Sequence, residues 1–126
     1  MNQASAPKRV LVVDDNEDAA FLVAEVLRMR GHEVQVATGG PEGYTAATTS
    51  LPDVVVLDIG MPVMDGYQVA VALRAATLTC GVRLIALTAW SDRESRMRAI
   101  QSGFNSHLVK PADFEELFQA IEVCVA

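Results

Sequence analysis

The chain has 126 residues, of which 51% are apolar, so one compact domain can bury a core without help from disulfides or a metal. Its net charge of −6, with ten scattered basic residues, excludes the basic footprint of direct nucleic-acid binding. The chain has no membrane-length apolar run, no signal-peptide pattern and no metal or disulfide spacing of its two cysteines, which predicts a cytoplasmic protein outside the membrane.

Short apolar runs alternate with segments of helical periodicity. The continuous β-branched run Val10–Val13 predicts a strand buried on both faces, and the apolar spacing that begins at Ala19 predicts a helix ending near Gly31. The remaining expected elements are a strand over Glu33–Ala37, a helix from the break at 39–41 to about Ser50, a strand over Asp53–Leu57, a helix over about Tyr67–Ala76, a strand over Arg83–Leu87, a helix from a capping box at Ser91 and Glu94 to Gly103, a strand over Ser106–Val109 and a helix from near Asp113.

Strand and helix therefore alternate five times. This order predicts an α/β fold in which a parallel sheet with right-handed crossovers carries helices on both faces. We expect a single domain over residues 1–126, with an ordered core over about 8–124. In such sheets the ligand site lies beyond the carboxyl ends of the strands.

The predicted strand ends carry charged and hydroxyl side chains. They are Asp14 and Asp15, Asp58, Thr88, and Lys110 followed by Pro111. Three carboxylates in one cleft repel each other, and Mg²⁺, which prefers oxygen ligands, would relieve that repulsion. An aspartate beside a metal, with a lysine and a hydroxyl opposite, is typical of a phosphoryl acceptor. Taken alone, Asp14 and Asp15 are also typical of a helix N-cap.

The segments VLVVDDN, VVVLDIGMPVMDG, IALTAW and HLVKP resemble, in order and spacing, the motif set of bacterial response-regulator receiver domains across nearly the whole chain. The resemblance implies a flavodoxin-like, doubly wound sheet of five parallel strands in the order 2-1-3-4-5, with five helices. It implies that Asp14, Asp15, Asp58 and the Gly60 carbonyl hold Mg²⁺. It also implies that Asp58 is the phospho-acceptor, Thr88 the switch hydroxyl and Lys110 the phosphoryl-binding lysine, with a cis bond before Pro111.

The same resemblance implies a two-component phosphorelay switch rather than an enzyme with an external substrate. A histidine kinase or a histidine phosphotransfer protein would donate the phosphoryl group, and the chain's own catalysis would extend only to phosphotransfer and autodephosphorylation. The output face would comprise the last two helices and the strand between them, with a second copy or an adjoining kinase domain as candidate partners. The segment GFNSHLVKPADF resembles the receivers of hybrid histidine kinases in particular.

Three positions depart from the common pattern. His107 stands where many receivers carry tyrosine or phenylalanine, and we expect it to move inward with Thr88 in the switch. Because histidine titrates near neutrality, a pH role and an ordinary strand-end role both remain open. Gly60 leaves room for an attacking water, whereas Trp90 could shield the phosphoryl group or simply pack on the loop.

Two other classes of protein fit less well. A haloacid-dehalogenase-type Mg²⁺ phosphatase also uses an aspartyl phosphate, but it needs a second aspartate two residues after the nucleophile, where this chain has Gly60. A flavin carrier of similar topology needs a hydroxyl- and glycine-rich loop after the first strand. Here that loop is acidic and would repel a phosphate.

Overall fold

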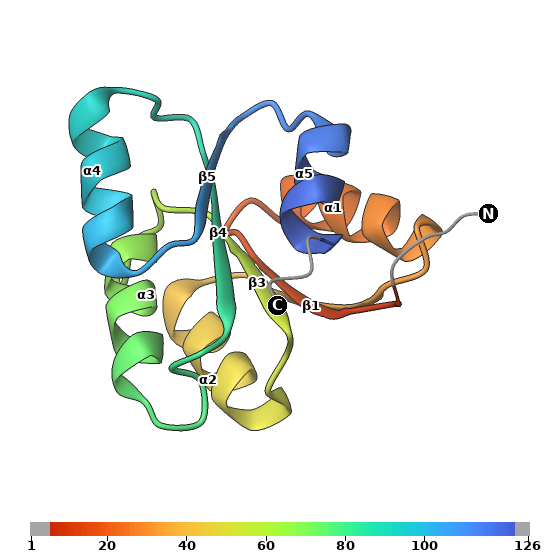
Figure 1. Cartoon of the computed structure of the whole chain (residues 1–126), viewed down its shortest axis with the longest axis horizontal. Coiled ribbons are helices and arrows are strands. Elements are labelled where there is room, and N and C mark those ends of the chain that lie inside the picture. The colour runs from red at the N-terminus through yellow and green to blue at the C-terminus, as the bar shows by residue number, and fades with distance from the viewer. Residues whose placement is uncertain (1–5, 123–126) are drawn as a thin grey trace.

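The computed structural model describes residues 6–122, in which five strands alternate with five helices (Figure 1). None of these helices is long and apolar enough to cross a membrane. The elements are β1 (Arg9–Val13), α1 (Glu17–Met29), β2 (Glu33–Ala37), α2 (Gly40–Ser50), β3 (Val54–Leu57), α3 (Gly66–Ala75), β4 (Arg83–Thr88), α4 (Arg93–Ser102), β5 (Ser106–Val109) and α5 (Phe114–Glu122).

The strands form one parallel sheet in the order β2-β1-β3-β4-β5, which confirms the predicted fold. Helices α2, α3 and α4 lie on one face and α1 and α5 on the other (Figure 1). Alternation along each strand sorts the apolar side chains between two cores. In β3, for example, Val55 and Leu57 pack towards α2 and α3, whereas Val54 and Val56 pack towards α1 and α5.

The expected boundaries agree with the observed ones to within one or two residues, except in how α4 begins. The capping box predicted at Ser91 and Glu94 is wrong. The N-cap is Asp92, whose carboxylate accepts a hydrogen bond from the Ser95 backbone N–H at 3.0 Å. The helix ends at Gly103 as predicted, and the Lys110–Pro111 bond is cis.

One arginine near the end of α3 joins two loops at the amino end of the sheet. The Arg74 guanidinium donates to the backbone carbonyls of Gly103, Cys80 and Val82 and to the Asn105 side chain. Gly103 has a φ of +107°, which favours glycine, and a Cβ there would also lie 2.7 Å from Arg74. The end of α3, the turn before β4 and the end of α4 are therefore held by one side chain.

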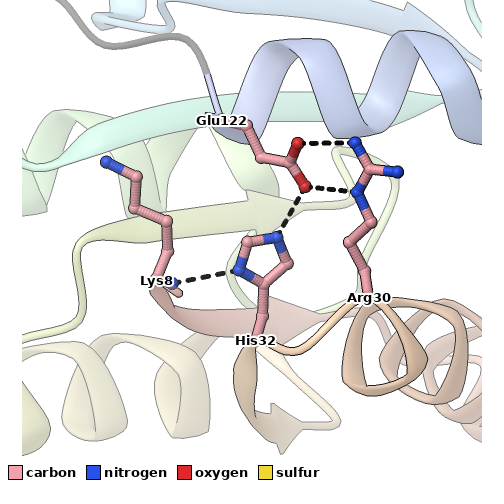
Figure 2. Close-up of polar contacts among 4 residues, drawn as sticks. All are labelled: Lys8, Arg30, His32 and Glu122. Carbon is pink, nitrogen blue, oxygen red and sulfur yellow. Dashed lines mark hydrogen bonds and ion pairs between the residues drawn. The ribbon is translucent and has the colours of Figure 1, made fainter. Parts of the chain in front are cut away.

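A second polar cluster, which we call the amino-edge cluster, consists of Lys8, Arg30, His32 and Glu122 (Figure 2). The Lys8 backbone N–H donates to His32 Nδ1 at 3.0 Å, so the proton of the neutral ring is on Nε2, which lies 2.8 Å from the Glu122 carboxylate. Arg30 makes two further bonds to that carboxylate, each 2.8 Å long.

The amino-edge cluster contains an ion pair between Arg30 and Glu122. The hydrogen bond from Arg30 lowers the pKa of Glu122 to about 2; burial opposes this shift and His32 adds to it. Arg30 also lies over the Phe118 ring, 4.5 Å from its centroid. The cluster thus ties the last turn of α5 to the starts of β1 and β2.

Candidate functional site

The predicted site residues follow the carboxyl ends of four strands and do meet at one edge of the sheet. The ladder of backbone hydrogen bonds continues just beyond the strands: the Asp58 N–H donates to the Val13 carbonyl at 2.9 Å, and the Lys110 N–H donates to the Thr88 carbonyl at 2.8 Å. These bonds fix the positions of the Asp58 and Lys110 backbones relative to β1 and β4.

Three carboxylates lie together at this edge. One oxygen from each of Asp14, Asp15 and Asp58 falls within 4.8 Å of the other two. Asp14 and Asp58 are only 5% and 9% exposed, while Asp15 is exposed. Burial and the charge of Asp14 raise the pKa of Asp58 against the opposing effect of Lys110. The cluster is therefore electrostatically unfavourable unless a cation joins it.

Lys110 is the cation that the protein itself supplies. Its Nζ lies 2.9 Å from Asp14 Oδ2 and 3.6 Å from Asp58 Oδ1, so the closer partner is Asp14. Burial lowers the pKa of the Lys110 ammonium, but the hydrogen bond to Asp14 and the charge of Asp58 outweigh burial and raise it. Two further positive charges, as a divalent cation supplies, would still be needed to balance three carboxylates.

The alternative interpretation of Asp14 and Asp15 as a helix cap is wrong. The N-cap of α1 is Asn16, whose side chain accepts from the Ala19 backbone N–H at 3.0 Å. The Asn16 N–H in turn donates to Asp14 Oδ1, also at 3.0 Å. Sequence reasoning missed this role of Asn16, although asparagine directly before a helical segment is a standard capping signal. Both aspartates are left free of helix capping.

Trp90 contacts both Thr88, at the end of β4, and Gly60, in the loop after β3. Thr88 is 1% exposed, and its hydroxyl oxygen accepts from the Trp90 backbone N–H at 3.3 Å. The Trp90 ring lies against Gly60: a Cβ placed on Gly60 would be 3.5 Å from two ring carbons. Trp90 is 47% exposed, so the ring covers Gly60 on one side and meets solvent on the other.

A sequence profile described as response regulator receiver domain matches residues 10–122. The chain belongs to the response regulator receiver domains. It is 38% identical over 122 residues to the transcriptional regulatory protein PrrA of Mycobacterium bovis, which covers 97% of this chain and 52% of PrrA. It is also 35% identical to the response regulator PleD of Caulobacter vibrioides over 90% of this chain and 25% of PleD.

Receiver structures agree with this assignment. The chemotaxis protein CheY4 of Vibrio cholerae superimposes with a TM-score of 0.85 at 31% identity, covering 90% of this chain and 95% of CheY4. The chain spans about half the length of PrrA. An uncharacterized 14.6 kDa protein of Leptolyngbya boryana, 36% identical, is instead matched over 95% of its length. The chain thus matches part of larger regulators such as PrrA and PleD, and nearly the whole of CheY4.

The loop after Asp58 in this receiver depends on a close backbone approach. A Cβ on Gly66 would lie 2.5 Å from the Asp58 carbonyl oxygen. The absence of a side chain on Gly66 therefore allows the start of α3 to pack against the backbone of Asp58 and Ile59. In the same loop Val63 has a φ of +71° and is 91% exposed, an unusual backbone conformation for a β-branched residue.

His107 lies on the same face of the sheet as Thr88. It is the register partner of Ala86, which lies two residues before Thr88 on β4, and alternation places Ala86 and Thr88 on one face. Ala86 is small, so the receiver leaves space beside the histidine ring. The ring is half-buried between β5 and α4.

Proposed function

We propose that this receiver is a Mg²⁺-dependent phosphorylation switch in which Asp58 accepts a phosphoryl group from a histidine kinase or a histidine phosphotransfer protein. The observation that carries the proposal is the Asp58 carboxylate itself, 9% exposed, 3.6 Å from the Lys110 ammonium and within 4.8 Å of two further carboxylates. A carboxylate nucleophile with a fixed ammonium beside it is the arrangement that acyl phosphate formation requires.

The transfer is a simple displacement at phosphorus. An Asp58 carboxylate oxygen forms the new O–P bond, the N–P bond of the phosphohistidine breaks, and its electron pair stays on the histidine nitrogen. Lys110 can follow a phosphoryl oxygen because it already bridges Asp14 and Asp58. The Thr88 hydroxyl can donate to another phosphoryl oxygen, since it now serves only as an acceptor for Trp90 N–H.

The donor set fits Mg²⁺. The carboxylates of Asp14, Asp15 and Asp58, with the backbone carbonyl of Gly60, would hold the ion, and these hard oxygen ligands are the kind that Mg²⁺ takes. When bound, the ion offsets the charge that develops on the phosphoryl oxygens. The raised pKa of Asp58 supports the fit, because its burial beside Asp14 leaves the cluster short of positive charge.

Incubation with acetyl phosphate tests the function. We expect intact mass spectrometry to show one added phosphoryl group in Mg²⁺ and none in excess chelator. Hydroxylamine, which cleaves acyl phosphates, should remove the group. Uptake that persists undiminished without a divalent cation, or a hydroxylamine-resistant product, would contradict an aspartyl phosphate formed at this site.

Mg²⁺ is expected to stabilise the folded receiver. An ion that binds only the folded state adds about 1.4 kcal/mol at a tenfold excess over its Kd. Because the folded protein raises the pKa of Asp58, ionising that group as pH rises costs stability, so Asp58→Asn should stabilise the metal-free protein. Asp15→Asn should do the same. Thermal melts with and without Mg²⁺ measure both effects.

Asp18→Asn is the matched control for the Mg²⁺ effect. Asp18 is an exposed aspartate in the first turn of α1, outside the carboxylate cluster. We expect this variant to keep the full rise in melting temperature with Mg²⁺, while Asp15→Asn and Asp58→Asn lose most of it. A wild-type melting temperature that is indifferent to Mg²⁺ would count against a metal site.

The proposed switch runs from Thr88 to the face formed by α4, β5 and α5. When the Thr88 hydroxyl moves to a phosphoryl oxygen, it vacates space that His107, on the same face of the sheet, can fill. Phosphorylation thereby shifts the populations of two packings of this face. The shift can be no larger than the difference in free energy by which the phosphoryl group favours one packing over the other. We propose that this face then meets the output partner, a second copy or an adjoining kinase domain, in the cytoplasm.

Thr88→Ala is expected to separate phosphorylation from its transmission. The acceptor, Lys110 and the carboxylates remain, so beryllofluoride, which mimics the phosphoryl group, should still bind. The amide shifts that it induces over residues 93–109 should shrink by more than half, because the hydroxyl that vacates space is missing. Thr79→Ala, a buried threonine at the other edge of the sheet, should leave those shifts intact. Full shifts in Thr88→Ala would rule out this route.

A further inference from the structure

The two ring nitrogens of His107 are buried and have no partner among the described residues. Neither Nδ1 nor Nε2 has a hydrogen-bond partner among residues 6–122, and both atoms are shielded from solvent. Within that part of the chain they are the only buried side-chain nitrogen or oxygen atoms in this situation. Folded proteins pair nearly all of their buried polar atoms, so an unpaired ring at the centre of a proposed switch points to a role in switching.

The polar groups around the ring are engaged elsewhere. The two carboxylate oxygens of Asp92 accept from the backbone N–H and the hydroxyl of Ser95, at 3.0 and 2.7 Å. The side-chain oxygens of Asn105 and Ser106 accept from arginine side chains. A protonated imidazole must donate from both nitrogens, and neither nitrogen has a hydrogen-bond partner in this position among residues 6–122.

The charges that face the ring come from α4. Arg96 lies along the same cavity as His107, and Asp92 lies at the start of the helix, while the partner on β4 is the uncharged Ala86. Burial and then Arg96 lower the pKa of His107; Asp92 and the residue's own backbone carbonyl oppose them without reversing the shift. The charged ring is thus disfavoured where the neutral ring packs.

We propose that His107 makes the α4–β5 face responsive to pH, because the ring remains packed only as the neutral base and turns outward when it binds a proton. A cavity of about 180 Å³ between α4 and β5, lined by Arg96, Ile100 and Phe104, adjoins the ring and gives it room to move. The second half of this inference rests on the proposed function: phosphorylation favours the inward ring, so protonation and phosphorylation act in opposite directions on one side chain.

The sign of the effect follows from linkage. A conformation that holds a proton less tightly than its alternative loses population as pH falls below about 6.5, the ordinary pKa of histidine. The packed ring is that conformation here. Acid should therefore weaken the packing of α4 on β5 in the free receiver, and should weaken the response to a phosphoryl group in the modified one.

Histidine ring signals in NMR spectra, recorded between about pH 5 and 8, test the inference directly. The signals missing from His107→Phe identify His107, and the remaining ring signals belong to His32. We expect the pKa of His107 to lie below its value in the urea-unfolded chain, and to fall further when Mg²⁺ and beryllofluoride are added. A pKa at or above the unfolded value would overturn the proposal. The variant His107→Phe serves in this measurement only to assign the signals, and the titration itself is of the wild-type protein.

Amide shifts supply the second measurement. Signals from residues 93–109 should move with the His107 titration in the wild-type protein and remain still in His107→Phe, which keeps a ring but cannot bind a proton. The same movement in His107→Phe would refute the proposed pH response through His107. If beryllofluoride fails to bind while His107 titrates as expected, the proposed function fails and the pH response of the free receiver stands.

Discussion

Asp58→Asn is expected to abolish labelling of this receiver by acetyl phosphate. The amide nitrogen that replaces one carboxylate oxygen is not a nucleophile, and the neutral side chain no longer contributes charge for Mg²⁺. Among the three clustered aspartates, Asp58 stands at the end of the central strand β3, while Asp14 is occupied by Lys110 and Asn16. Intact mass spectrometry after incubation in Mg²⁺ should show no added phosphoryl group.

Asp53→Asn offers a control from the other end of the same strand. Asp53 immediately precedes β3, and its carboxylate accepts the Arg9 backbone N–H at 2.8 Å, a bond that an asparagine oxygen can keep. We expect this variant to be labelled at the wild-type rate. Labelling of Asp58→Asn at that rate would show that the acceptor lies elsewhere and that the proposed site is wrong.

Arg74→Ala is expected to have the largest effect on stability among variants outside the site. Its guanidinium donates to three backbone carbonyls and to Asn105, whose side-chain oxygen also accepts the Leu84 N–H at 2.8 Å. Charged hydrogen bonds are worth about 1.5–3 kcal/mol each and are not additive, so we expect a loss of about 3 kcal/mol in the free energy of unfolding. Urea denaturation measures it.

Arg9→Ala is the matched control for Arg74. Arg9 is an exposed arginine near the same edge of the sheet, with a single side-chain bond of 3.4 Å to the Leu51 carbonyl. Its removal should change the free energy of unfolding by less than about 0.5 kcal/mol. Arg74→Lys should fall between the two, because a lysine reaches one of these carbonyls but not all. Equal stabilities for Arg74→Ala and Arg9→Ala would refute the role given to Arg74.

The sheet and the neighbourhood of the site were predictable because both depend on local signals. Runs such as Val54–Leu57 predict a strand that is buried on both faces. Because the strands pair in parallel, the residues that follow them lie at a common edge of the sheet. Asp14, Asp58 and Lys110 come together for that reason alone. The strand order came from the family resemblance, because alternation of strands and helices by itself permits several orders.

Features that depend on distances between side chains were not predictable. The sequence indicated that Lys110 faces the carboxylates, but only the folded structure shows that Asp14 is its nearer partner. The N-cap of α4 illustrates a local competition: Ser91 and Asp92 are both good caps, and the chain uses Asp92. Arg74 carried no sequence signal, since its acceptors are backbone carbonyls that any residue supplies.

The amino-edge cluster has a consequence for how the receiver persists once folded. Its ionic bond joins Arg30 to Glu122 across 92 positions of the chain, and His32 to Glu122 across 90. Closing so long a loop is entropically unfavourable until the sheet has brought both segments together, so we expect these bonds to form late in folding. Interactions that are absent from the folding transition state leave the folding rate nearly unchanged and slow unfolding instead. By this reasoning the cluster sets how long the receiver stays folded rather than how quickly it folds.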